Sequence, residues 1–174
     1  GVERAADEET GFGPIIKLAG ELFARVLSMS TPVSAQSLVV AAGLGSAATA
    51  RGVTTWFPTV AKPSWNPPNW IFGPVWSTLY VLMASSANAA WGDRLARRTF
   101  FIILLVNSLW SLLFFGLHRP DLALIDIVGY LILLGIWIRQ LWPQHRGAAL
   151  LQLPHLAWVS FATLLNASIC WLNK

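Results

Sequence analysis

Aromatic and amide side chains, rather than acids or thiols, are the groups in this sequence that could do chemistry. Trp76, Trp110 and Trp158 fall well inside apolar stretches instead of at their ends. A wall of flat indole rings suits a large planar apolar ligand, which it can bind by stacking. Packing of the rings against neighbouring helices is the alternative, and it is the commoner reason for any single one of them.

Two asparagines, Asn107 and Asn166, also lie within apolar stretches. Each amide can hydrogen-bond across helices or to the polar edge of a ligand, and the sequence leaves both roles open. His155 offers different chemistry, because an uncharged imidazole can ligate the metal of a haem or the magnesium of a chlorophyll. A histidine that only forms hydrogen bonds is the alternative, and the pattern does not fix which face of its helix looks inward.

Several other chemistries have no basis in the sequence. It contains no Ser-His-Asp arrangement, no HExxH motif, no phosphate-binding loop and no pair of carboxylates. Its single cysteine, Cys170, excludes an internal disulfide framework and a cysteine-based zinc site. The formal net charge of +4 provides no basic patch of the kind that nucleic acid needs. We therefore expect binding rather than catalysis, with no nucleic-acid partner.

Long apolar segments must position these side chains. The chain is 55% hydrophobic and 11% charged, whereas soluble domains carry about 25% charged residues. Each of five apolar stretches approaches the roughly 20 residues that cross a hydrocarbon core. They cover residues 33–53, 69–91, 99–117, 122–142 and 148–171. We predict an all-α integral membrane protein built as a five-transmembrane-helix bundle, with short loops except at residues 52–68.

The N-terminal 30 residues form a separate part in this prediction. Residues 1–13 are polar and acidic, which is typical of a flexible tail. From Pro14 onward, apolar residues recur at helical spacing beside a charged line, which predicts a short amphipathic helix. It docks either on the membrane surface or on a partner. Residues 31–174 form the transmembrane domain, whose small-residue stretch AAGLGSAATA favours close helix packing within the bundle or a homodimer contact.

The segment KPSWNPPNWIFGPVW, Lys62–Trp76, is rich in tryptophan and proline. Tryptophan is favoured at the headgroup level of a membrane, and a proline-rich loop has fewer N–H donors to satisfy near lipid. Pro74 is expected inside the second span, where it would free the carbonyl of Trp70 and kink the helix. The segment is therefore interpreted as an interfacial loop that runs into a kinked helix.

Four motifs together resemble one family. They are WFPTVAKPSWNPPNWIFGPVWSTLYVLM at Trp56–Met83, NSLWSLLFFGL at Asn107–Leu117, LALIDI at Leu122–Ile127 and PHLAWVSFATLLNASI at Pro154–Ile169. Their order and spacing resemble those of the translocator protein family, also called the tryptophan-rich sensory protein or peripheral benzodiazepine receptor family. The match covers residues 33–173.

The resemblance implies a pocket closed by the loop between the first two helices, frequent homodimers, and binding of porphyrins, haem and sterol-like or drug-like molecules. Some bacterial members degrade protoporphyrin in light, which is the only enzymatic activity implied, and its tryptophans match Trp56 and Trp158. The family's pocket positions correspond here to Trp56, Trp65, Trp70, Asn107, Trp110, Trp158, Phe161, Ala162 and Asn166.

This sequence departs from the family at a few positions. Phe57 and His155 stand where the family usually has tyrosine, and the C-terminal segment lacks the tyrosine of the animal cholesterol motif. Since the equivalent tyrosine is associated with the cavity, the resemblance implies that His155 faces it. We therefore add His155 to the expected ligand-binding residues, and it is the candidate axial ligand of a bound metal; no other metal site is expected.

Taken together, these patterns predict a multi-pass protein of an organellar (mitochondrial or plastid) or bacterial membrane. The expected ligand is a porphyrin, haem, chlorophyll-type tetrapyrrole or similar planar hydrophobic molecule, bound for sensing, transport or scavenging, with no obligatory cofactor. The alternative is a small accessory subunit of a larger membrane complex. Such a subunit would dock through its N-terminal helix and hold pigments or lipids in its grooves.

Overall fold

The computed structural model describes residues 52–174, and every regular element in that range is helical. The amphipathic helix and nearly all of the first span predicted above lie outside the described residues. In chain order the elements are η1 (Phe57–Thr59), η2 (Asn69–Ile71), α4 (Phe72–Ala89), α5 (Arg94–Ser111), η3 (Leu112–Gly116), α6 (Pro120–Leu141), α7 (Arg146–Leu151) and α8 (Leu153–Leu172). The all-helical prediction is confirmed for this part of the chain.

Three helical segments of the described range are long and apolar enough to cross a membrane: Arg94–Gly116, Pro120–Leu141 and Arg146–Leu172. Their outward faces carry large apolar side chains, and Leu105, Ile125 and Leu164 are between 64% and 71% exposed. A soluble protein rarely exposes so much contiguous apolar surface. These faces are therefore suited to contact with lipid.

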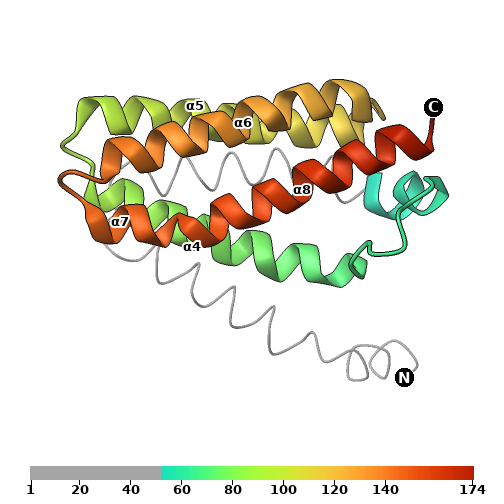
Figure 1. The fold of residues 1–174 in the computed structure, drawn as a ribbon, viewed down its shortest axis with the longest axis horizontal. Helices are drawn as coiled ribbons and strands as arrows, with labels where there is room; N and C mark the ends of the chain where they lie inside the picture. The colour runs from blue at the N-terminus through green and yellow to red at the C-terminus, as the bar shows by residue number, and fades with distance from the viewer. Residues whose placement is uncertain (1–51) are drawn as a thin grey trace, which may run out of the picture.

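The core lies between α5, α6 and α8, which run side by side, with α6 in the middle (Figure 1). Its largest fully buried side chains include Phe100, Tyr130, Leu134 and Trp137. The α4 helix is attached mainly at one end, where it packs on the short helix α7. From there α4 and α8 diverge toward the other end of the bundle, which holds the loop 56–71 and the C-terminus (Figure 1).

Two helix boundaries differ from the sequence prediction. Pro74 is the third residue of α4 rather than an interior residue, so its missing N–H falls in the first turn, where N–H groups have no partner inside the helix. The predicted interior position of Pro74 is therefore wrong. The last predicted span is divided at Gln152, which ends α7 and precedes α8. Pro154 explains the division, because it lacks the N–H that would continue the hydrogen-bond ladder.

One close backbone approach fixes the start of the described chain against the bundle. The backbone of Gly52 lies so near Phe115 in η3 that an added Cβ would be 2.6 Å from the Phe115 Cβ and 2.7 Å from its carbonyl oxygen. No side chain fits in this space. The contact brings the residues after Gly52, including Phe57, to the same end of the bundle as η3.

Candidate functional site: an aromatic pocket inside the bundle

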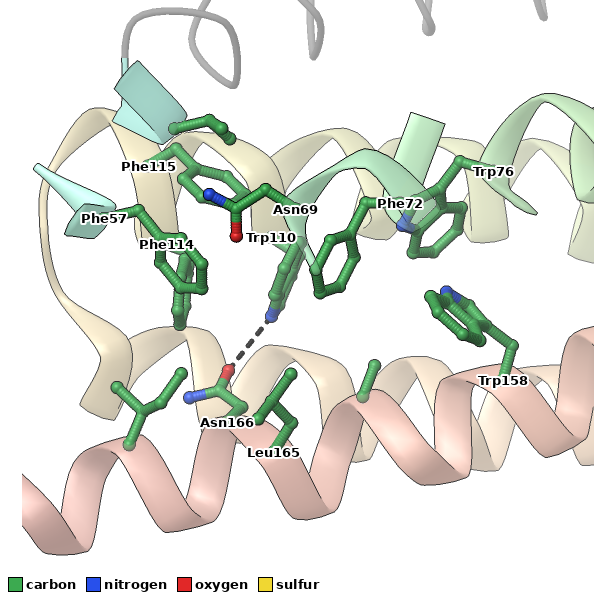
Figure 2. Close-up of a pocket in the computed structure, with 13 residues that line it drawn as sticks. Phe57, Asn69, Phe72, Trp76, Trp110, Phe114, Phe115, Trp158, Leu165 and Asn166 are labelled. Atoms are coloured by element: carbon green, nitrogen blue, oxygen red, sulfur yellow. Dashed lines mark hydrogen bonds between the residues drawn. The ribbon is translucent and has the colours of Figure 1, made fainter. Parts of the chain in front are cut away.

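An apolar pocket lies at the loop end of the bundle, between α4, the α5–η3 segment and α8 (Figure 2). Aromatic rings form most of its wall. Phe57 and Phe115 lie at one end of the view in Figure 2, and Trp76 and Trp158 lie at the other. Among residues 52–174 the lining consists of Val53, Phe57, Asn69, Phe72, Trp76, Trp110, Phe114, Phe115, Trp158, Ala162, Leu165, Asn166 and Ile169.

A hydrogen-bonded pair fixes one side of the pocket. The Trp110 indole Nε1 donates to Asn166 Oδ1 at 3.1 Å, and Asn166 Nδ2 donates to the Pro120 carbonyl oxygen at 2.8 Å (Figure 2). Asn166 is buried and so connects α5, the start of α6 and α8. The Trp110 ring also stacks on Phe114, with the ring centroids 5.0 Å apart. These contacts hold the Trp110 ring in a single orientation.

Trp158, on the opposite side, is held differently. Its Nε1 is buried and has no hydrogen-bond partner in the described part of the protein. Its ring lies against two other rings: Phe72 edge-to-face at 5.8 Å and Phe161 at 5.3 Å between centroids. The indole N–H is thus available to a hydrogen-bond acceptor on a ligand, and the side chain is not tied by a polar contact.

The pocket is contracted in this structure. It encloses about 70 Å³, whereas pockets that hold drug-sized ligands measure roughly 300–1,000 Å³. The rings around it are packed edge to face and stacked rather than held apart. A large ligand therefore requires some of these side chains to move.

The structure brings four of the predicted site residues together in the pocket wall: Trp110, Trp158, Ala162 and Asn166. Phe161 lies next to this group, in contact with Trp158 and, at 5.7 Å between ring centroids, with Trp65. Trp65 and Trp70 are about half exposed and do not line the pocket. In the described structure these two loop tryptophans lie outside its wall.

Trp56 lies in a different place from the one implied by the resemblance. Its ring stacks on His118, with centroids 4.7 Å apart and an angle of 14° between the planes. It lines a second cavity, together with Asp121, Cys170 and other residues near the C-terminus. Trp56 touches the wall of the aromatic pocket only from outside, through an edge-to-face contact with Phe114 at 5.4 Å between centroids. Trp56 and Trp158 therefore do not face each other across one cavity.

Asn107 also lies outside the pocket wall. Its Nδ2 donates to the Tyr80 hydroxyl at 2.8 Å, so the amide joins α5 to α4. The Tyr80 ring in turn lies against Trp76, which lines the pocket, at 5.8 Å between centroids. In this arrangement Asn107 contacts the pocket wall only indirectly, through Tyr80 and Trp76.

His155 is enclosed by protein on every side. It is fully buried, its Nε2 lies 2.7 Å from the Tyr130 hydroxyl, and its Nδ1 lies 3.0 Å from Gln152 Oε1. The Gln152 Nε2 donates to the Leu82 carbonyl oxygen at 3.0 Å, which orients the amide and leaves Oε1 as the acceptor for His155. His155 Nδ1 therefore carries the proton, and Nε2 accepts from Tyr130.

This network corrects the expectation that His155 faces the cavity as a metal ligand. Both ring nitrogens are engaged with protein groups, and the side chain is absent from the pocket wall. Its only relation to the pocket is an edge-to-face contact with Trp76, at 6.2 Å between centroids. Among residues 52–174, no group of three or more metal-ligating side chains was found.

Sequence reasoning missed several lining residues, above all Phe57, Asn69, Phe72, Phe114 and Phe115. A signal for the last two was present in the LLFFG end of the second motif, which continues the face of Trp110 by one turn. That continuation becomes η3, a π-helical turn in which the Leu117 N–H bonds to the Leu112 carbonyl oxygen at 2.8 Å. The wider π turn changes which residues face inward, which helical spacing alone does not reveal.

The apolar helices and the enclosed aromatic wall define a membrane protein with a pocket inside its helix bundle. Residues 34–172 match the model of the TspO/MBR family, and the chain belongs to that family. It is therefore a multi-pass membrane protein.

Three curated relatives illustrate the range of the match. The chain is similar to the tryptophan-rich protein TspO of Archaeoglobus fulgidus, 44% identical over 134 residues that cover 74% of this chain and 87% of the relative. It is 33% identical to the translocator protein of Homo sapiens over 122 residues, 64% of this chain and 70% of the relative. It is 31% identical to the tryptophan-rich sensory protein of Cereibacter sphaeroides over 121 residues, 68% of this chain and 77% of the relative.

Proposed function

We propose that this protein binds a tetrapyrrole, or a similar planar hydrophobic molecule, in the aromatic pocket, for sensing, transport or scavenging. The observation that carries the proposal is the pocket wall, in which indole and phenyl rings outnumber polar side chains. Such a wall favours a flat apolar ligand through stacking and edge contacts. Two relatives are named translocator protein and tryptophan-rich sensory protein, and these names agree with transport or sensing.

The polar groups of the wall add a requirement on the ligand. The Trp158 Nε1 has no partner in the described structure, and the Asn69 side chain also lines the pocket. A ligand with a carbonyl or carboxylate at its edge can accept a hydrogen bond from this indole, and leaving a buried donor unpaired costs about 1–3 kcal/mol. Purely hydrocarbon ligands should therefore bind less tightly than planar ligands with one acceptor group.

Two finer features belong to the same proposal. The first span, at residues 33–53, completes a five-helix bundle, and the loop 56–71 covers the mouth of the pocket. Because Trp56 and Trp158 do not face one cavity here, the proposal concerns binding alone and assigns no step of porphyrin degradation.

The proposal predicts saturable binding of protoporphyrin IX that does not depend on a central metal. Since both nitrogens of His155 are already bonded to protein groups, haem gains no axial ligand from it. We expect haem and protoporphyrin IX to bind with dissociation constants that agree within about threefold, a difference below 1 kcal/mol. Titration of the protein in mild detergent, followed by the Soret band and by tryptophan fluorescence, measures both.

A matched variant shows what the titration reports. His155→Phe removes the imidazole. If His155 ligated haem, this variant would bind haem less tightly and the Soret band of bound haem would shift. Its affinity for protoporphyrin IX would stay the same. Absence of saturable binding for either compound would contradict the proposed function. Tighter binding of haem alone, lost in His155→Phe, would contradict the described position of His155.

A further inference from the structure

A second apolar hollow lies between α4 and α8, next to the aromatic pocket, with which it shares Trp158. It measures about 580 Å³. Its floor and sides include Thr78 and Leu82 from α4, and Ala157, Trp158 and Phe161 from α8. We call this hollow the α4–α8 groove. None of the described residues that line it is charged, and the Thr78 hydroxyl is already bonded to the Pro74 carbonyl oxygen of its own helix at 2.9 Å.

The groove exists because α4 and α8 are fastened at one end and diverge from it (Figure 1). At the fastened end the Gln152 Nε2 donates to the Leu82 carbonyl oxygen at 3.0 Å and to Ser86 Oγ at 2.8 Å. Farther along, the side chains that face the groove form no hydrogen bond across it: Thr78 bonds within α4, and the Trp158 Nε1 has no partner in the described range. The open end can therefore widen without breaking a polar contact between the groove walls.

Trp158 is the wall that the groove shares with the aromatic pocket, since its ring lines both. Figure 2 shows this side chain at the end of the pocket, on α8, facing Trp76. Its ring packs against Phe72 and Phe161, and its Nε1 has no hydrogen-bond partner in the described range. Rotation of this one side chain would join the contracted pocket of about 70 Å³ to the groove of about 580 Å³.

We propose that Trp158 is a movable partition and that the α4–α8 groove is the membrane-facing half of the ligand site. An apolar ligand dissolved in the bilayer enters through the groove, displaces the Trp158 ring, and lies with one edge in the aromatic pocket and the other against acyl chains. The groove proposal rests on the proposed function for the identity of the ligand, but the entry route through the groove is independent of it. It accounts for the size of the pocket, because the combined space falls in the range of roughly 300–1,000 Å³ that ligand pockets occupy.

The groove is tested by narrowing it from each side in the full chain, reconstituted in phosphatidylcholine nanodiscs. Ala157→Phe adds a ring on α8 and Thr78→Phe adds one on α4, and neither residue lines the aromatic pocket. Ala89→Phe is the control, since Ala89 is exposed at the end of α4 and lies outside the groove. The probes are protoporphyrin IX and, separately, pyrene. We expect both groove variants to lower the affinity about tenfold and the control to change it less than about twofold.

Lipid contact is measured directly on the wild-type protein. Phosphatidylcholine that carries a nitroxide on its acyl chain should quench the fluorescence of the bound probe, whereas iodide in the water should not. This measurement also decides the proposal if both groove variants fail to fold, as judged by thermal melting.

The outcomes separate the two proposals. The groove proposal is wrong if the two groove variants bind the probes as tightly as Ala89→Phe does. It is also wrong if the nitroxide lipid does not quench the bound probe. If pyrene binds and protoporphyrin IX does not, the proposed ligand class is wrong. The affinities of the groove variants for pyrene then decide whether the groove is part of the ligand site. If neither probe binds the wild-type protein, both proposals are wrong.

Discussion

Replacement of Ala162 by phenylalanine is expected to lower the affinity for protoporphyrin IX about a hundredfold. Ala162 is 8% exposed and lines the aromatic pocket beside Trp158. A phenyl ring at this position would occupy the inner space where the edge of the ligand is expected. If it excludes about 100 Å² of apolar ligand surface, the loss at about 25 cal/mol per Å² is roughly 2.5 kcal/mol, which corresponds to that change in affinity.

Leu164→Phe provides the matched control on the same helix. Leu164 is 64% exposed and lies outside the pocket, so the new ring faces lipid and the affinity should change less than about twofold. Thermal melting must show that Ala162→Phe is folded, because overpacking costs roughly 1–3 kcal/mol. Ala162→Leu is the smaller replacement if it is not. Unchanged binding in a folded Ala162→Phe protein would show that the ligand lies elsewhere.

Substitution of Gln152 by leucine is expected to produce the largest loss of stability among single changes in the buried network. The Gln152 side chain is fully buried, donates to the Leu82 carbonyl and to Ser86 Oγ, and accepts from His155 Nδ1. The leucine would leave three buried polar groups without this partner. Hydrogen bonds between membrane helices contribute about 0.6–1.7 kcal/mol each, so the expected loss is about 2–4 kcal/mol.

Gln140→Leu, on α6, is the control. It shows whether the loss of stability in Gln152→Leu comes from the hydrogen-bond network or from the removal of any buried amide. Gln140 Oε1 is buried and has no hydrogen-bond partner in the described range. Gln140→Leu should therefore change the free energy of unfolding by less than about 1 kcal/mol, or increase it, because a buried unpaired oxygen is removed. Reversible unfolding in mixed micelles measures both variants. Equal losses in the two would contradict the role assigned to Gln152.

Helix positions were predictable because apolar runs of membrane length leave few alternatives. The predicted span 122–142 agrees closely with α6, whereas the span 99–117 matches the end of the α5–η3 segment but starts later than α5, which begins at Arg94. The break at Gln152 was missed because the residues on both sides continue the apolar pattern, although Pro154 is a local signal for it. A polar residue in such a run gives no local indication of its hydrogen-bond partners, which for Gln152 are on α4 and at His155.

The pocket was predictable only in part, for a related reason. Trp110, Trp158, Ala162 and Asn166 line the aromatic pocket, whereas Asn107, which also lies in a regular helix, bonds to Tyr80 instead. Trp56 precedes a short 3₁₀ turn, and the course of that loop, rather than helical spacing, decides where its ring points. The role of His155 depends on Tyr130, 25 residues away, and no local pattern contains that contact.

The central claim is that a planar ligand lies against the rings of the aromatic pocket, and the indole N–H signals of the tryptophans test it most directly. Protoporphyrin IX added to the ¹⁵N-labelled protein should shift the signals of Trp76, Trp110 and Trp158, which line the pocket, through the ring current of the porphyrin. The signals of Trp142 and Trp171, which are exposed on the outer surface, should stay in place. Shifts at Trp142 and Trp171, with none at the three pocket tryptophans, would contradict the claim.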